Sequence, residues 1–401
     1  MYKDNYDLLV SAENDSAYHH YMAGLDESLG LDNSGIDAFK KSLSFDPEFA
    51  LANALLAKQL AIYESPKKAQ KYLNFALRYK QNSSPREQEI IIIISMLLSA
   101  NPRCLNAALE HIKVYPNDII ILSIILGPFG LLAFSETLDW QQRNLTILKE
   151  VEGYFPDDDW WFKTTQAFMY IEGGKIQEAE PLSQSAWEMK NTGNCAHTLT
   201  HLHYETENYK EGRQFIKNWK LSNQGKSNMT HHVLWHDALL ALKRNEKNEI
   251  YSMCKNLVAN KSGAGNLEYF ADNASLLWYC VIEGIKVPSL WFVQMYEYAD
   301  TNFPDIGFKF VDLHRSMMAA TLSKEEREEY LARISKHDNN DTSSLINLTQ
   351  GFMACYDNKP LETTGFLSKI DKENAIYGGS SVQRYIIKET LLKKHKIVQK
   401  N

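Results

Sequence analysis

The stretch GIDAFKKSLSFDP, from Gly35 to Pro47, decides the fold. Along it Phe39, Ser42 and Leu43 share one helical face, and Pro47 follows where a helix has to end. An aromatic residue, a small residue, an apolar residue and a closing proline in this order are typical of the second helix of a stacked helix hairpin. The stretch therefore predicts one half of such a hairpin.

Two later units keep the same phase, each with small or apolar residues where two helices must approach closely. The matching positions are Leu56, Ala57, Ala69, Leu73, Ala76 and Leu77 in the next unit, and Ala167, Tyr170, Ala179 and Ala186 in a further unit near 161–191. A period of about 34 residues is that of tetratricopeptide repeats. The sequence therefore predicts an all-α, tetratricopeptide-like α-solenoid, a right-handed superhelix of helix hairpins with negligible sheet.

No linker rich in glycine, serine or proline divides the chain, so we expect one helical solenoid over residues 1–401. Within it, the clearest repeats are expected at 34–193. Histidine-rich helices are expected at 194–245 and C-terminal helical repeats at 246–401.

Composition excludes several kinds of partner. Of 401 residues, 23% are charged and 44% are hydrophobic, and the net charge of -7 lacks the basic excess that a nucleic-acid backbone attracts. The five cysteines are scattered without a CxxC spacing, which fits a reducing compartment. The acidic N-terminus does not resemble an export signal, and no apolar run is long enough to cross a bilayer. We expect a soluble cytoplasmic protein that binds neither nucleic acid nor membrane, and its oligomeric state stays open.

The segment AHTLTHLHYETEN begins at Ala196, where the first helix of the next hairpin belongs. His197, His201 and Glu205 follow one another at i, i+4 and i+8, which spreads them over only about 80° of one helix face. His203 points away from that face. Three ionisable side chains are thus expected in one row.

The segment HHVLWHDAL repeats this spacing with His232 and His236. First helices of neighbouring hairpins lie side by side, so we expect the two pairs to converge. Neutral imidazole binds zinc, iron or copper, and imidazole also titrates near neutral pH. The cofactor is not identified by the sequence, but a transition metal bound by histidines fits the pattern, and the predicted ligands are His197, His201, His232 and His236. The predicted acid–base groups of this segment are His201, His236 and Glu205.

The same histidines also fit a purely structural interpretation. Helix interfaces of this kind need side chains of middle size, and a buried histidine with a hydrogen-bond partner is a satisfied core residue. The HxxxH spacing lacks the glutamate that completes the HExxH zinc motif. Both interpretations remain open from the sequence.

Two other segments carry weaker signals. FVDLHR places Asp312 and His314 two residues apart, on opposite sides of a helix, and we add both to the predicted catalytic set. GGSSVQR puts two glycines before a helix start, where free backbone N–H groups and Arg384 can hold an anion. Ser380, Gln383 and Arg384 are therefore predicted, with His203, to bind a substrate, and the three C-terminal residues are expected to face the same cavity as the histidines.

Five blocks of the chain together resemble the tetratricopeptide repeat protein 38 family over most of the length, from about Ala38 onward. In chain order they are SPREQ from Ser84, HTLTHLHYE from His197, HVLWH from His232, VDLH from Val311 and GGSSVQR from Gly378. The resemblance implies an α-solenoid of about the whole chain. It groups the candidate residues of these blocks at matched positions, which implies a shared site, and it implies no particular activity.

Two functions from different classes follow. In the first, the solenoid encloses a pocket in which the histidines bind a metal or a small polar molecule, and the protein is an enzyme of specialised metabolism. In the second, the concave groove binds a peptide or partner protein and the histidines are internal packing. Whether the protein is an enzyme is left open by the sequence, although its ionisable residues gather in one place, as in the first reading.

Overall fold

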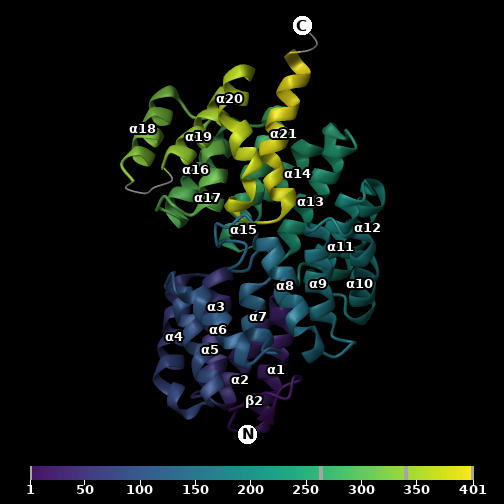
Figure 1. Ribbon diagram of the computed structural model, residues 1–401, viewed down its shortest axis with the longest axis vertical. Helices are drawn as coiled ribbons and strands as arrows, with labels where there is room; N and C mark the ends of the chain where they lie inside the picture. Colours follow the sequence, from purple (N-terminus) through teal and green to yellow (C-terminus); the bar gives the residue numbers. More distant parts are fainter. Residues whose placement is uncertain (1, 262–264, 338–341, 399–401) are drawn as a thin grey trace.

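The computed structural model describes residues 2–261, 265–337 and 342–398 (Figure 1), which form 21 α-helices, three short 3-10 helices and one pair of two-residue strands. In the first half of the chain the elements are β1 (Tyr2–Lys3), β2 (Leu9–Val10), α1 (Asp15–Leu29), α2 (Ser34–Phe45), α3 (Ala50–Tyr63), α4 (Pro66–Tyr79), η1 (Lys80–Asn82), α5 (Pro85–Leu98), α6 (Cys104–Val114), α7 (Ile119–Ile125), α8 (Trp140–Val151), η2 (Glu152–Tyr154), α9 (Trp160–Glu172) and α10 (Ile176–Met189). In the second half they are α11 (Gly193–Glu205), α12 (Tyr209–Asn223), α13 (Thr230–Lys243), α14 (Lys247–Ala259), α15 (Asn266–Glu283), α16 (Ser289–Asn302), α17 (Lys309–Ala319), α18 (Lys324–Ser335), α19 (Thr342–Tyr356), α20 (Pro360–Lys372), η3 (Asn374–Tyr377) and α21 (Ser381–Val398).

Most helices pair with the next helix along the chain and form hairpins. Examples are α1 with α2, α3 with α4, α9 with α10, α11 with α12 and α19 with α20. The first helices of successive hairpins also contact one another, so that α9, α11, α13, α15, α17 and α19 form a continuous row. This arrangement is a tetratricopeptide-like α-solenoid, and the predicted fold class is confirmed. The division into residues 34–193, 194–245 and 246–401 remains a prediction.

Local sequence explains where several of these helices begin. Ser84 and Glu87 form a capping box at the start of α5, and Pro85 occupies the first turn, where its missing N–H costs no hydrogen bond. The side chain of Asp159 accepts a hydrogen bond from the backbone N–H of Phe162 at the start of α9. Each cap satisfies backbone donors that the helix itself leaves free.

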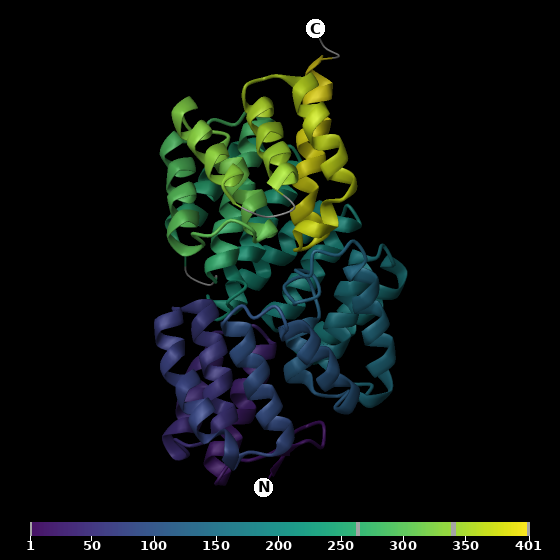
Figure 2. The same cartoon turned by 60° about the vertical axis from the view of Figure 1, so that its left-hand side comes forward.

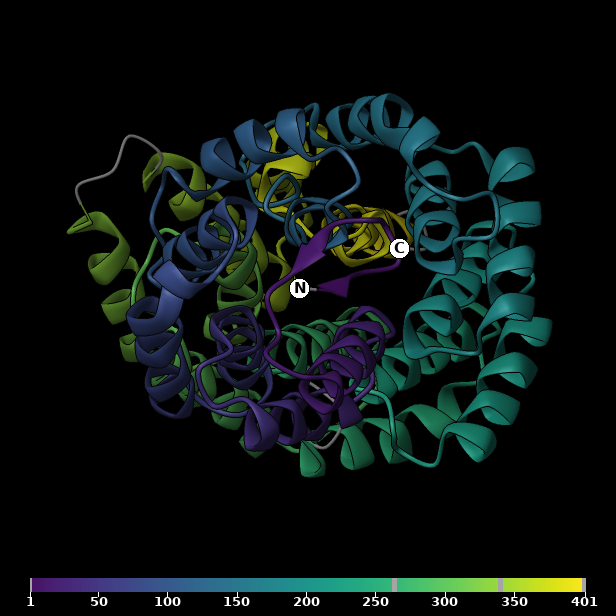
Figure 3. The same ribbon diagram turned by 90° about the horizontal axis from the view of Figure 1, so that it is seen from below.

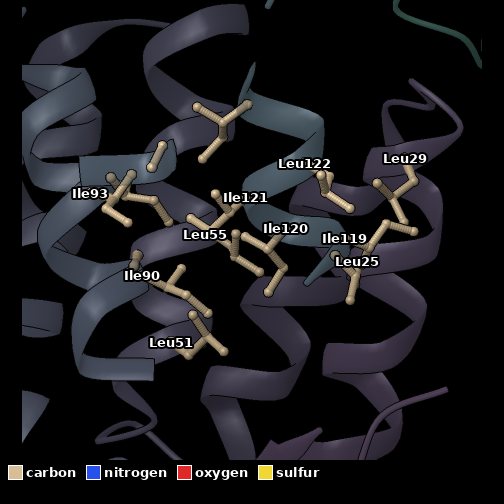
Figure 4. Close-up of a cluster of buried hydrophobic side chains, with 14 of the residues drawn as sticks. Leu25, Leu29, Leu51, Leu55, Ile90, Ile93, Ile119, Ile120, Ile121 and Leu122 are labelled. Carbon is tan, nitrogen blue, oxygen red and sulfur yellow. The ribbon is translucent and has the colours of Figure 1, made fainter. Parts of the chain in front are cut away.

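The first helices of the N-terminal half share an apolar core (Figure 4). Leucines of α1 and α3 pack against isoleucines of α5 and α7, and all of them are buried. The labelled core residues are Leu25, Leu29, Leu51, Leu55, Ile90, Ile93, Ile119, Ile120, Ile121 and Leu122. The apolar run from Ile119 onward thus begins with a buried helix.

The row of helices winds around the long axis, so that it looks round from below (Figure 3), while the C-terminal helices lie above the N-terminal ones in the side view (Figure 2). Helix α21 contacts α15, α19 and α20. Its Glu389 forms an ion pair of 2.6 Å with Lys243 of α13, and the Nε1–H of Trp278 on α15 donates to Thr390 at 2.9 Å. Helix α21 therefore packs against the helices of the second half of the chain.

The short strands at the N-terminus were not predicted. β1 and β2 pair antiparallel. Arg86 of α5 donates a hydrogen bond of 3.1 Å to the Leu9 carbonyl of β2 and forms an ion pair of 3.5 Å with Asp4, which follows β1. Asp118 forms an ion pair with the same guanidinium, with 2.6 Å between Oδ2 of Asp118 and Nε of Arg86. This buried charge network anchors the N-terminal segment to the core.

The turn between α1 and α2 accepts backbone hydrogen bonds from the starts of α11 and α13. The backbone N–H of Asn194 donates to the Gly30 carbonyl at 3.1 Å, and that of Asn228 donates to the Leu31 carbonyl at 2.8 Å. Residues about 160 to 200 positions apart in the chain are thereby joined, and the two helices that carry the histidine pairs are held at their N-termini.

We expect Gly193→Ala to lower the free energy of unfolding by about 1–3 kcal/mol, because an added Cβ would lie 1.9 Å from Oγ of Ser227 and 2.9 Å from its Cβ. Urea denaturation measures the change. Gly153→Ala is the matched control, because nothing lies within 4 Å of a Cβ added there. Equal effects of the two substitutions would contradict the tight contact.

Candidate metal centre

Helix α11 presents His197 and His201 on one face because the two are one turn apart. Thr192 caps the start of this helix, because its side chain accepts a hydrogen bond of 3.2 Å from the backbone N–H of Cys195. Helix α13 presents His232 and His236 in the same way and contacts α11 directly. The predicted convergence of the two pairs is therefore present.

The four imidazoles form one compact group. Each offers a ligand nitrogen, and these four atoms all lie within 4.8 Å of one another. The ring centroids of His197 and His201 are 4.6 Å apart, those of His201 and His236 are 4.5 Å apart, and those of His232 and His236 are 4.8 Å apart. No side chain of the four is more than 3% exposed.

Most nitrogens of this group lack a hydrogen-bond partner among the described residues. They are Nε2 of His197, Nε2 of His232, and both ring nitrogens of His201 and of His236. A buried polar atom without a partner costs about 1–3 kcal/mol. Six such atoms in one place are rare in a core of satisfied histidines.

Aromatic rings surround the group and exclude water. Phe168 of α9 lies 4.7 Å from His201 between centroids, Trp235 stacks on His232 at 5.1 Å, and Phe129 meets His232 edge-on at 5.7 Å. The four imidazoles thus lie among aromatic side chains.

Burial first, and then the neighbouring imidazoles, lower the pKa of His197, His201 and His236 well below the ordinary value for histidine. At neutral pH these rings are uncharged. A neutral imidazole keeps a lone pair on one nitrogen, which is the form that binds a metal ion.

A carboxylate that the sequence analysis missed completes the centre. Asp272 of α15 is fully buried, and Nδ1 of His232 lies 2.9 Å from each of its oxygens. Burial alone would raise the pKa of Asp272, but the electrostatic interactions and hydrogen bonds with His232 and His231 lower it below the ordinary value. The available signal was a lone acid in the apolar run FADNASLLWYC, on the first helix of the hairpin after His232.

Glu205 does not belong to the four-histidine group. Its Oε2 accepts a hydrogen bond of 3.5 Å from the hydroxyl of Tyr385 on α21, and its Oε1 is buried without a partner. Burial, and next the charge of Glu172, raise the pKa of Glu205 to about 7. The predicted row on α11 therefore divides into a histidine layer and, one turn further, a carboxylate layer.

Asp312 and His314 both lie on α17, but they contact different groups. Asp312 accepts from the backbone N–H of Gly307 at 2.8 Å and pairs with Arg315 at 3.5 Å, while burial raises its pKa to about 6. Nδ1 of His314 donates to the Phe310 carbonyl at 2.7 Å, and burial lowers its pKa to about 4. Neither residue is in the four-histidine group.

The C-terminal block meets a carboxylate of the protein itself. Glu172, at the end of α9, accepts hydrogen bonds from the backbone N–H of Ser381 at 3.0 Å and from its hydroxyl at 2.8 Å, and lies 3.5 Å from the guanidinium of Arg384. Gln383 Oε1 accepts from the backbone N–H of Ser380 at 2.9 Å. The start of α21 and Arg384 thus contact Glu172, a carboxylate of the protein itself.

His203 turns away from the other histidines, as its place on the helix predicts. Its ring lies 5.8 Å from that of Phe215 on α12, and its Cβ lies close to Gly212. Substrate binding by His203, Ser380, Gln383 and Arg384 stays a prediction.

No protein-family model matches the chain. Among solved structures, the chain is similar to the crystal structure of the P58(IPK) TPR domain, with 12% identity over 96% of this chain and 99% of that chain and a TM-score of 0.21. Within the described residues, no helix is both long enough and apolar enough to cross a membrane.

Proposed function

We propose that this protein binds one transition-metal ion between α11 and α13, through His197, His201, His232 and His236. One observation carries the proposal: four buried imidazoles, with six unpartnered nitrogens among them, meet between aromatic side chains. A bound ion supplies the partner that these nitrogens lack.

The donor set limits the kind of ion. Imidazole nitrogen suits zinc, copper, nickel and iron, whereas magnesium and calcium prefer oxygen. Zinc–nitrogen bonds of about 2.0–2.1 Å place tetrahedral ligand atoms about 3.4 Å apart. The four ligand nitrogens lie within 4.8 Å of one another, so the four side chains would have to move only a little closer together to bind an ion. Four protein ligands with this burial resemble a closed structural site more than one that keeps a position for substrate.

Catalysis is a second candidate, supported by Glu205. A carboxyl group with a pKa of about 7, one helical turn from His201, can give or accept a proton at neutral pH. In this version, His201, His236, Glu205, Asp312 and His314 form the acid–base set and a small polar molecule is the substrate. In the alternative, the protein is a scaffold: the concave groove binds a peptide, and the histidines only pack the interior.

We also propose membership of the tetratricopeptide repeat protein 38 family and a cytoplasmic location. The family proposal is supported by the places of its five blocks: three lie on the first helices α11, α13 and α17, and the others start α5 and α21. These blocks include all four proposed ligands.

We expect untagged protein to contain close to one equivalent of a transition metal by elemental analysis. Metal added at about 100 times its Kd should stabilise the fold by about 2.7 kcal/mol, and removal with a strong chelator should lower the melting temperature. Magnesium is the control and should have no effect. A protein that neither contains nor binds zinc, copper, nickel or iron contradicts the proposal and favours the scaffold.

A further inference from the structure

The hydrogen bond between His232 and Asp272 determines which nitrogen of His232 is free. Both oxygens of Asp272 lie 2.9 Å from Nδ1, and an ionised carboxylate only accepts hydrogen bonds, so Nδ1 carries the proton and donates it. Nε2 then carries the lone pair. It is also the nitrogen of His232 without a partner.

A second contact holds the carboxylate itself. Nδ1 of His231 lies 3.4 Å from Oδ2 of Asp272, and His231 is in turn held through its Nε2, which lies 3.3 Å from the side-chain amide nitrogen of Asn273. These residues come from α13 and α15, neighbouring first helices of the row. The orientation of Asp272 is therefore set by the stacking of two hairpins.

We infer that Asp272 is the positioning residue of the proposed metal centre: it holds His232 in the tautomer and orientation in which Nε2 binds the ion. The inference rests on the proposed function. A carboxylate behind a metal-binding histidine fixes the ring and makes its free nitrogen a stronger donor. Three successive first helices then share the centre, because α11 and α13 supply the ligands and α15 supplies their support.

The test measures Co²⁺ affinity by competition with a coloured chelator and records the visible absorption of bound Co²⁺. Asp272→Asn should weaken binding about 10- to 100-fold, because a neutral amide no longer enforces the Nδ1–H tautomer. It should also change the Co²⁺ spectrum. Ser275→Ala is the control, since Ser275 is equally buried on the same helix. It should bind Co²⁺ as the wild type does.

A double-mutant cycle separates positioning from a general effect on the fold. In a His232→Ala background, Asp272→Asn should weaken Co²⁺ binding no more than about twofold, because the side chain through which Asp272 acts is gone. An undiminished loss in that background overturns the inference, and so does wild-type affinity in Asp272→Asn. If the wild type itself binds no transition metal, the proposed function falls instead.

Asp272→Glu covers the case in which Asp272→Asn does not fold. It keeps the acceptor and lengthens the side chain, so its affinity should lie between those of the wild type and His232→Ala. An affinity as low as that of His232→Ala overturns the inference.

Discussion

Replacing His201 by alanine is expected to abolish stoichiometric metal binding while the protein remains folded. His201 has contacts with His197 and His236 at ring distances of 4.6 and 4.5 Å, and neither of its nitrogens has another partner. Loss of a ligand should exceed the effect of losing a supporting residue, so we expect affinity to fall by more than about 100-fold. Elemental analysis and Co²⁺ titration measure this loss.

Leu202→Ala is the matched control for that substitution. Leu202 is the next residue of α11 and is also buried, so its truncation should lower stability by about 2–5 kcal/mol and leave metal content unchanged. The opposite pattern for His201→Ala, a large drop in melting temperature with metal binding unchanged, would mean that the histidines are core packing.

Replacing Asp118 by alanine should have the largest effect on stability, a loss of about 3–5 kcal/mol. Arg86 is only 4% exposed, and its Nε donates to Asp118 at 2.6 Å, while Nε2 of His111 lies 2.9 Å from the same carboxylate. Removal of Asp118 takes away the closest partner of this buried guanidinium and leaves the longer ion pair with Asp4 at 3.5 Å. Urea denaturation monitored by circular dichroism measures the loss.

The same network predicts a direction for the pH dependence. Burial would raise the pKa of Asp118, but Arg86 and His111 outweigh it and hold that pKa below the ordinary value. A carboxyl group with a depressed folded-state pKa stabilises the fold above its unfolded-state pKa, and this contribution is lost as the pH falls through the folded-state value. The wild type should therefore lose stability in acid more steeply than Asp118→Ala. Asp157→Ala, at an exposed acid, should change stability by less than about 0.5 kcal/mol, and an equally small effect at Asp118 would contradict the prediction.

Several features of the fold and of the centre were open to prediction because they depend on local spacing. A repeat near 34 residues predicts stacked hairpins, and i, i+4 spacing places His197 with His201 and His232 with His236 on single faces. The neighbouring positions of the two helices follow from the repeat as well. The four-histidine group therefore follows from the sequence.

Other features depend on how the hairpins stack. Asp272 lies on the hairpin next to that of His232, but the contact between the two side chains depends on how α13 and α15 pack. Nothing in the spacing pairs Glu172 with the start of α21, because this contact joins helices far apart in the chain. Glu205 lies on the histidine face of α11, yet its partner is Tyr385 of α21, whose hydroxyl donates a hydrogen bond to it.

By itself, the sequence determined the helical repeats, the faces of their helices and the four histidines that meet. Only the tertiary structure decided that α15 supports His232 with a carboxylate, that Glu172 neutralises Arg384, and that Arg86 anchors an N-terminal strand pair. The physical reason is the range of the interactions. Helix periodicity is set by backbone hydrogen bonds over four residues, whereas the partner of a buried charge is set by which helix faces the packed core brings together.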